Sequence, residues 1–142
     1  MADLNERAGK ALRELHALGA VKSPWLAGMR DTSGQRVVED WLTPVWHDST
    51  CGRWRTSSEV GYAVTMSDPD TNDPATLGCL LALAREAYND TALHVGPWFA
   101  TACVWAHLGD GPGYDGVGEG DTESEALVAA LEARVAMLRG GE

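Results

Sequence analysis

The triplet Arg53-Trp54-Arg55 contains the residue types that most directly suggest binding. Arginine and tryptophan contribute strongly to many interfaces, and an arginine side chain can stack on a flat ring. Arg30 and Arg36 add positive charge to the same region of the sequence. The triplet therefore indicates a binding surface. The alternative is the end of a surface strand, with Trp54 in the core and both flanking arginines paired to acidic side chains.

A second candidate surface is acidic and lies in the glycine-rich stretch 109–121. This stretch has no P-loop lysine, and no G-x-G-x-x-G motif runs from a strand into a helix. A helix N-terminus follows it and could attract an anion, but the nearby acids would repel phosphate. We interpret the stretch as a flexible loop whose acids favour the dipole of the next helix. The acidic surface comprises Asp110, Asp115, Glu119 and Asp121.

Cysteine and histidine side chains are the remaining candidates for chemistry. His47 and Cys51 have the spacing of two zinc ligands, but a structural zinc site needs four ligands and no second pair accompanies them. Cys103 and His107 fall on one face of a predicted strand, yet nothing supplies an orienting group or an oxyanion hole. The sequence therefore predicts no metal, no cofactor and no catalytic centre. If the chain were a small hydrolase instead, these four residues would be the ones to replace.

The overall charge restricts the class of partner. The 142 residues include 11 basic and 21 acidic side chains, which gives a formal net charge of −10. This balance argues against binding to a nucleic-acid backbone, which requires clustered Lys and Arg, whereas an acidic surface can bind a basic surface on another protein. No apolar run approaches the roughly 20 residues of a transmembrane helix, and the N-terminal segment is too charged for a signal peptide. We expect a cytoplasmic protein whose cysteines are reduced.

The elements that would position these residues form one domain, 1–142. It divides into an N-terminal helix (1–20), a Trp-rich irregular segment (21–58) and a sandwich core (59–139). Helix starts are indicated by three caps: Asp3 with Glu6, Asp73 before Pro74, and Thr122 with Glu125. The predicted helices are 3–18, 73–88 and 122–139, with a short helix near 35–42. The predicted strands are 59–66, 92–95 and 98–108, with a weak edge strand near 114–117. A turn or bulge is predicted at Gly96-Pro97.

These elements predict an α/β (α+β) fold, an α-β-α sandwich in which amphipathic helices flank one small, mainly antiparallel sheet. We interpret the polar face of the first helix as an ordinary solvent-exposed face. It carries Arg7, Lys10, Arg13 and Glu14. The irregular segment contains four of the six tryptophans. Their rings either cover a face of the sheet or form a binding surface, and the sequence leaves both interpretations open. These tryptophans are Trp25, Trp41, Trp46 and Trp54.

Two segments resemble a known family. TNDPATLGCLLAL at 71–83 and GDTESEALVAALEA at 120–133 resemble small phage and prophage proteins of unknown function, some of which belong to a family described as the phage α-β-α sandwich domain. The resemblance covers roughly residues 58–139, with support from the first helix. It implies the sandwich fold and a phage-type accessory origin, and it implies no active site.

Charge, size and resemblance together predict a non-enzymatic accessory protein that antagonises a bacterial defence system. In the main hypothesis, an anti-CRISPR-like acidic surface binds a bacterial host protein in the host cytoplasm. An alternative is an oligomer that sequesters a nucleotide-derived defence signal through arginine and tryptophan side chains. Another alternative is a phage structural or assembly component that forms homo-oligomers.

Overall fold

The computed structural model describes residues 3–37, 45–48, 50, 52–57, 63–97, 104–107 and 116–140. Within these ranges the chain forms three helices, each separated from the next by three short strands. The helices are α1 (Leu4–Ala17), α2 (Pro74–Tyr88) and α3 (Glu123–Gly140); the strands are β1 (Val45–Asp48), β2 (Arg53–Ser57), β3 (Ala63–Met66), β4 (His94–Pro97), β5 (Val104–His107) and β6 (Gly116–Gly120).

The three long helices begin where their capping residues predict. Asp3 caps α1 by accepting a hydrogen bond from the backbone N–H of Glu6 at 2.8 Å. Asp73 caps α2 in the same way through the N–H of Thr76 at 3.0 Å, and Pro74 follows it. Thr122 Oγ1 accepts from the N–H of Glu125 at 3.1 Å at the start of α3. Each cap satisfies a backbone donor that has no partner inside the helix.

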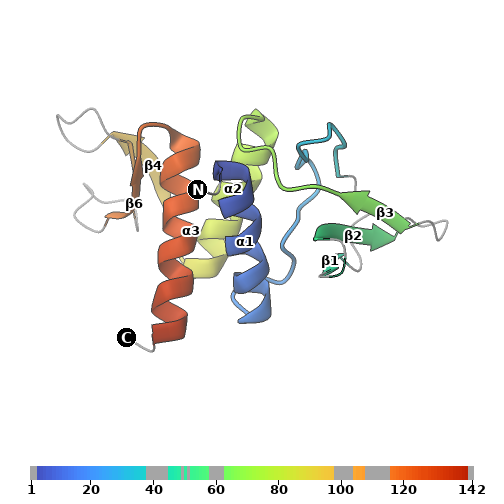
Figure 1. The fold of residues 1–142 in the computed structure, drawn as a ribbon. Helices are drawn as coiled ribbons and strands as arrows, with labels where there is room; N and C mark the ends of the chain where they lie inside the picture. Colours follow the sequence, from blue (N-terminus) through green and yellow to red (C-terminus); the bar gives the residue numbers. More distant parts are fainter. Residues whose placement is uncertain are drawn as a thin grey trace.

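All three helices run in the same direction, so their N-termini gather at one end of the molecule (Figure 1). Asn5 and Thr71 connect the first two: Asn5 Oδ1 accepts from the N–H of Thr71 at 2.9 Å and from its hydroxyl at 2.6 Å. The Ser124 hydroxyl then donates to the carbonyl of Thr71 at 2.6 Å. These bonds hold the starts of α1 and α3 to the turn before α2.

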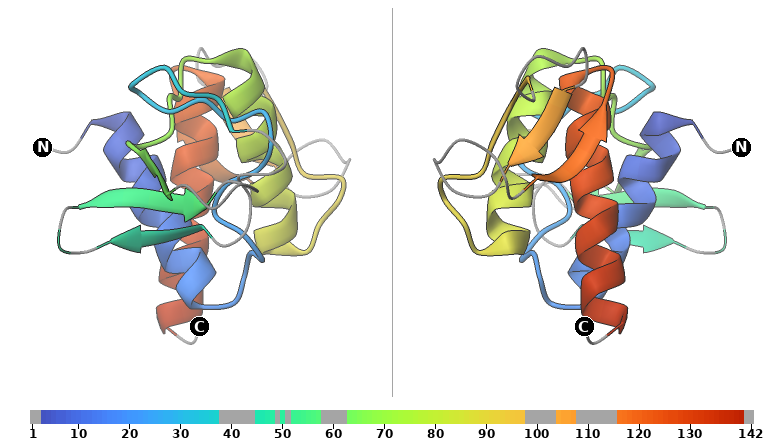
Figure 2. Two further views of the ribbon diagram at one scale, coloured as in Figure 1. Left: turned by 90° about the vertical axis from the view of Figure 1, so that its right-hand side faces the viewer. Right: turned by 90° about the vertical axis from the view of Figure 1, so that its left-hand side faces the viewer.

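The strands form two separate antiparallel sheets, with the orders β1-β2-β3 and β4-β5-β6. Two perpendicular views place the helices between the sheets (Figures 1 and 2). The mixed α/β class with small antiparallel sheets is therefore confirmed. The prediction that residues 63–66 share a sheet with 94–107 is wrong, because β3 pairs with β2 and is separated from the second sheet by the helices.

Several local predictions also differ from the structure. Gly96 and Pro97 pair with Trp105 and Val104 inside β4 and β5, so they form no turn. Residues 116–120 form β6 at the edge of the second sheet, so the edge strand predicted near 114–117 is confirmed at 116–117, and the strand continues to Gly120 where a loop was predicted. The short helix predicted near 35–42 is absent at residues 35–37, where Arg36 bridges to Arg30, and residues 38–42 lie outside the described ranges. The described parts of the irregular segment contain β1 and β2.

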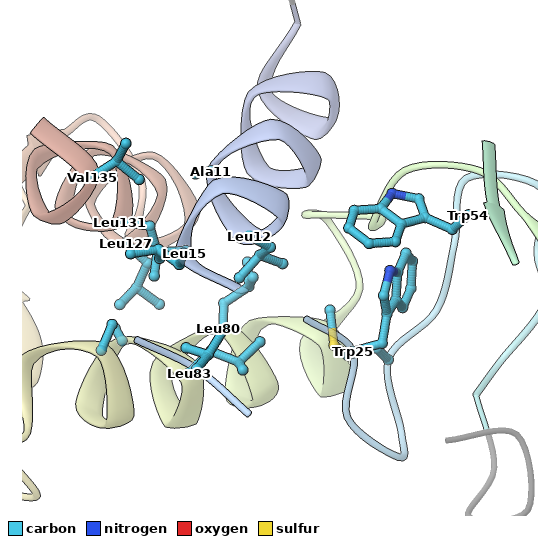
Figure 3. Close-up of a cluster of buried hydrophobic side chains, with 14 of the residues drawn as sticks. Ala11, Leu12, Leu15, Trp25, Trp54, Leu80, Leu83, Leu127, Leu131 and Val135 are labelled. Carbon is cyan, nitrogen blue, oxygen red and sulfur yellow. The ribbon is translucent and has the colours of Figure 1, made fainter. Parts of the chain in front are cut away.

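The core lies among the three helices and extends to β2 and β3 (Figure 3). α1, α2 and α3 contribute aliphatic side chains that are at most 8% exposed, and the segment after α1 adds Trp25 and Met29. Leu138 is 37% exposed, because the last turns of α3 extend beyond the core. None of the described helices is long and apolar enough to cross a membrane.

Candidate functional site

Trp54, the centre of the predicted binding triplet, is a core residue. It lies on β2 and is 1% exposed, and its ring meets Trp25 and His47 edge-on, with centroids 5.9 and 5.3 Å apart. Figure 3 shows the indoles of Trp25 and Trp54 beside the helical core. Trp54 therefore cannot stack on a ligand in this conformation. The irregular segment contains two further tryptophans, Trp41 and Trp46. Trp41 and the side chain of Trp46 lie outside the described residues.

The arginines around Trp54 separate into paired and exposed groups. Arg55 Nε lies 2.9 Å from Asp48 Oδ2 across the β1–β2 pair. Arg36 donates to both carboxylate oxygens of Asp73, at 2.9 and 3.0 Å, and to the carbonyl of Gly28 at 2.7 Å. Arg30 and Arg53 are exposed. The structure thus brings Arg30 and Arg36 together but gives Arg36 and Arg55 acidic partners within the fold.

A groove runs along the polar face of α1. One part has a volume of 570 Å³ and a second, of 200 Å³, continues it toward α3. Arg7, Lys10 and Glu132 line both parts, so the two hollows are neighbours on the surface of α1. The larger part is also lined by Glu6, Arg13, His47, Gly52 and Asp68, and the smaller part by Ala11, Glu14 and Val135.

One contact in the groove fixes the state of His47. Arg13 Nη1 lies 3.0 Å from His47 Nε2. A guanidinium has only donors, so His47 Nε2 must accept the hydrogen bond. His47 is therefore neutral in this contact and carries its proton on Nδ1.

Asp68 lies in the same groove, against the backbone of α1. A side chain at Gly9 would collide with Asp68 Oδ1, so the carboxyl packs directly on the helix at this glycine. Burial raises the pKa of Asp68, and the nearby charges of Glu6 and Asp3 raise it further, while Trp54 and Arg13 oppose the rise. The fold therefore favours the protonated form of this carboxyl more than water does.

Acidic side chains gather at the end where the three helices begin. We call this surface the acidic end; it consists of Asp3, Glu6, Asp70, Glu119, Asp121 and Glu123. These residues lie at the start of α1, in the turn before α2 and around the start of α3. No ion pair involves any of the six within the described part of the chain. Two predicted acidic residues, Asp110 and Asp115, lie outside the described ranges.

Only some of the residues predicted as candidates for metal binding or thiol chemistry lie within the described ranges. Cys51, Cys103 and the side chain of His107 lie outside the described residues. Among the residues that are described, no group of three or more His, Cys, Asp or Glu side chains could hold a metal ion. Cys79 is half-buried and donates to the carbonyl of Ala27 at 3.5 Å, and burial raises the pKa of its thiol. A raised thiol pKa disfavours the reactive thiolate.

Sequence reasoning missed the groove, although part of its signal was visible. Arg7, Lys10 and Arg13 recur every three residues on one face of α1, a spacing that places side chains side by side. That face reads as ordinary solvated surface, because nothing in the sequence indicates that β1 brings His47 to it or that α3 supplies Glu132.

Comparisons with models of protein families, with curated proteins and with solved structures found no significant match to this chain.

Proposed function

We propose that this chain is a non-enzymatic, phage-type accessory protein that binds a basic surface on a bacterial host protein and thereby antagonises a defence system. The acidic end carries the proposal, since six carboxylates gather there and have no cationic partner among the described residues. Such a surface attracts a positively charged partner and repels nucleic acid. The phage origin rests on the resemblance of residues 71–83 and 120–133.

The parallel arrangement of the helices explains how the fold tolerates this concentration of charge. Each helix N-terminus carries a partial positive charge, which stabilises acids in the first turn by about 0.3–1 kcal/mol. Glu6 and Glu123 lie in the first turns of α1 and α3. The hydrogen bonds among Asn5, Thr71 and Ser124 hold the helix starts together. The acids therefore form one surface with contributions from distant parts of the sequence.

Favourable interaction with a helix dipole does not account for every carboxylate of the acidic end. Glu119 lies in β6, before the start of α3, and is exposed. Asp70 lies in the turn ahead of the α2 cap, Asp73. Because the dipole acts mainly within the first turn, Glu119 is better explained by a role at the surface, whereas Asp70 Oδ1 also accepts a hydrogen bond from the backbone N–H of Asn72 at 3.1 Å in that turn.

The test is capture of a partner from a bacterial host extract, with the charge of the acidic end as the variable. We expect a basic protein to be retained at low salt and lost at about 0.5 M salt, where charges beyond a few ångströms are screened. Glu119→Gln and Asp121→Asn should each weaken retention. Glu86→Gln is the matched control: it also removes one negative charge, but from the C-terminal half of α2.

Two results would contradict the proposal. One is the absence of any salt-sensitive partner. The other is a partner whose retention falls as much with Glu86→Gln as with Glu119→Gln, because that dependence would reflect net charge alone and not the acidic end.

A further inference from the structure

The three cations in the α1 groove differ in how far the fold neutralises them. Arg7 is paired with a carboxylate, since its Nε and Nη2 donate to the two oxygens of Glu132 at 3.0 and 2.6 Å. Lys10 lies 4.0 Å from Glu14, and its side chain is 70% exposed. Glu14 in turn is bound more closely by Arg139, at 2.9 Å. Lys10 is thus only weakly compensated.

Arg13 is the least compensated of the three. Within the described part of the chain its one hydrogen-bond partner is the neutral imidazole of His47, and no carboxylate lies within ion-pair distance of it. A guanidinium has five N–H donors in a fixed planar arrangement, so this contact uses one of them.

We infer that Lys10, Arg13 and His47 form a binding site for an oxyanion, the phosphate or carboxylate group of a small molecule. Lys10 and Arg13 are three residues apart on α1 and therefore neighbours on its surface. Arginine presents paired donors that match the geometry of phosphate and carboxylate oxygens. His47 also lines this part of the groove and holds the guanidinium of Arg13 there through its Nε2. The inference does not depend on the acidic end.

The size of the groove favours a small organic molecule over a bare ion. Pockets for such ligands typically span roughly 300–1,000 Å³, and the larger part of the groove has 570 Å³. The continuation toward α3 has Ala11 and Val135 in its wall. The oxyanion would lie at Lys10 and Arg13, and a less polar part of the molecule would extend toward these apolar side chains.

Three carboxylates also line the larger part of the groove and must be weighed against the cations. Glu132 is neutralised by its two bonds from Arg7. Asp68 is held against Gly9, and its charge interacts with Arg13, so it competes with an anion for that guanidinium. Glu6 remains as a repulsive charge. Binding should therefore depend on close contact with Arg13 and Lys10, because the overall field of this acidic protein repels anions.

The experiment is calorimetric titration of the full chain with two probes, inorganic pyrophosphate and citrate, which distinguish phosphate from carboxylate as the source of the oxyanion. We expect saturable binding of at least one probe, weakened about tenfold by Arg13→Gln or Lys10→Gln, because each loses a charge-assisted hydrogen bond. Lys22→Gln is the matched control, since Lys22 is exposed and lies outside the groove. It should leave binding unchanged.

A second measurement keeps the test independent of folding defects in the variants. In the unsubstituted chain, titration with the bound probe should shift the NMR signals of the His47 imidazole, which are assigned by their loss in His47→Gln. Absence of saturable binding by both probes would overturn the inference. Binding that survives Arg13→Gln, or that leaves the His47 signals unmoved, would overturn it as well.

Discussion

The indoles of Trp25 and Trp54 meet edge-on, with ring centroids 5.9 Å apart and planes inclined by 75°. Edge-to-face geometry is a favoured arrangement of aromatic pairs. Trp54 belongs to β2 and Trp25 to the segment that follows α1. Both rings are at most 1% exposed, and each packs in the same core cluster as Leu12 of α1. The pair therefore attaches the first sheet to the helical core.

Trp54→Ala should destabilise the protein strongly, because it removes a large buried ring and leaves a cavity beside Trp25. Substitutions of this kind cost about 3–5 kcal/mol. Urea unfolding followed by circular dichroism measures the effect. Arg53→Ala, at the exposed neighbouring position, is the control and should change the free energy of unfolding little. Equal stability of the two variants would mean that Trp54 does not support the core.

The helices were predictable because their signals are local. Asp73 with Pro74, and Thr122 with Glu125, identify helix starts within a few residues, and the structure confirms both. The C-terminus of α2 is equally local, since Asn89 adopts the left-handed conformation (φ 52°) that ends many helices. No contact from elsewhere in the chain is needed to recognise these features.

The sheets were harder to predict because pairing depends on partners distant in sequence. β1 and β2 contain only four and five residues, and Arg53 and Arg55 interrupt the apolar pattern. The glycines of β6 indicate a loop by composition alone. In the structure a side chain at Gly118 would collide with the backbone of Ala126 and Ala130. Glycine there permits close approach of β6 to α3, which the sequence does not reveal.

Gly118→Ala should therefore be destabilising. The added methyl group would lie 2.9 Å from the Cα of Ala130 and closer still to the carbonyl oxygen of Ala126. Because these are backbone atoms, β6 would have to move away from α3, and overpacking typically costs about 1–3 kcal/mol. The matched control is Gly96→Ala in β4, where nothing lies within 4 Å of the added methyl. If thermal unfolding shows equal losses for both variants, close packing at Gly118 is not the cause.

The candidate site shows the same limit of sequence reasoning. Residue type made Trp54 a candidate binding residue and left a core position as the alternative, and burial confirms the core position. Arg13 and His47 are separated by 34 residues, and they become partners only because β1 lies beside α1. The sequence alone indicates a solvent-exposed surface for a polar helix face, because it does not show which segment packs next to that face.

Asp68→Asn should stabilise the protein near neutral pH. The pKa of Asp68 is raised in the fold, mainly by burial, so the folded state binds its proton more tightly than the unfolded state does. Stability therefore falls as pH rises from the ordinary carboxyl pKa of about 3.9 through the folded-state pKa, and the loss is complete above it. Asparagine does not titrate and avoids this loss.

The measurement for Asp68 is the free energy of unfolding of both proteins across the acidic and neutral range. The variant should be the more stable above the folded-state pKa of Asp68, and the difference should vanish below the ordinary carboxyl pKa. Asp70→Asn controls for loss of one negative charge from the same turn. An advantage of Asp68→Asn that persists undiminished at the acidic limit would contradict the assignment.

Arg36→Gln should make the protein more sensitive to acid, since Arg36 holds the cap of α2. Its two hydrogen bonds to Asp73 lower the pKa of that carboxyl well below the usual range, and bonds from the N–H and hydroxyl of Thr76 lower it too. The ionised Asp73 thus contributes stability that is present above the ordinary carboxyl pKa and is lost as pH falls through the lower, folded-state value. Without Arg36 that loss should begin at higher pH.

Acid unfolding monitored by circular dichroism measures this shift, with Arg53→Gln as the control for removal of a positive charge from an exposed position. Arg36→Gln should move the midpoint to higher pH, whereas Arg53→Gln should not. Asp73→Ala removes the cap itself and should cost about 0.5–2 kcal/mol near neutral pH. Combining it with Arg36→Gln should cost less than the sum of the two effects, because both substitutions abolish the contact between Arg36 and Asp73, and only the bond from Arg36 to the carbonyl of Gly28 is lost in addition. Full additivity of the two effects would show that Arg36 stabilises the fold by another route.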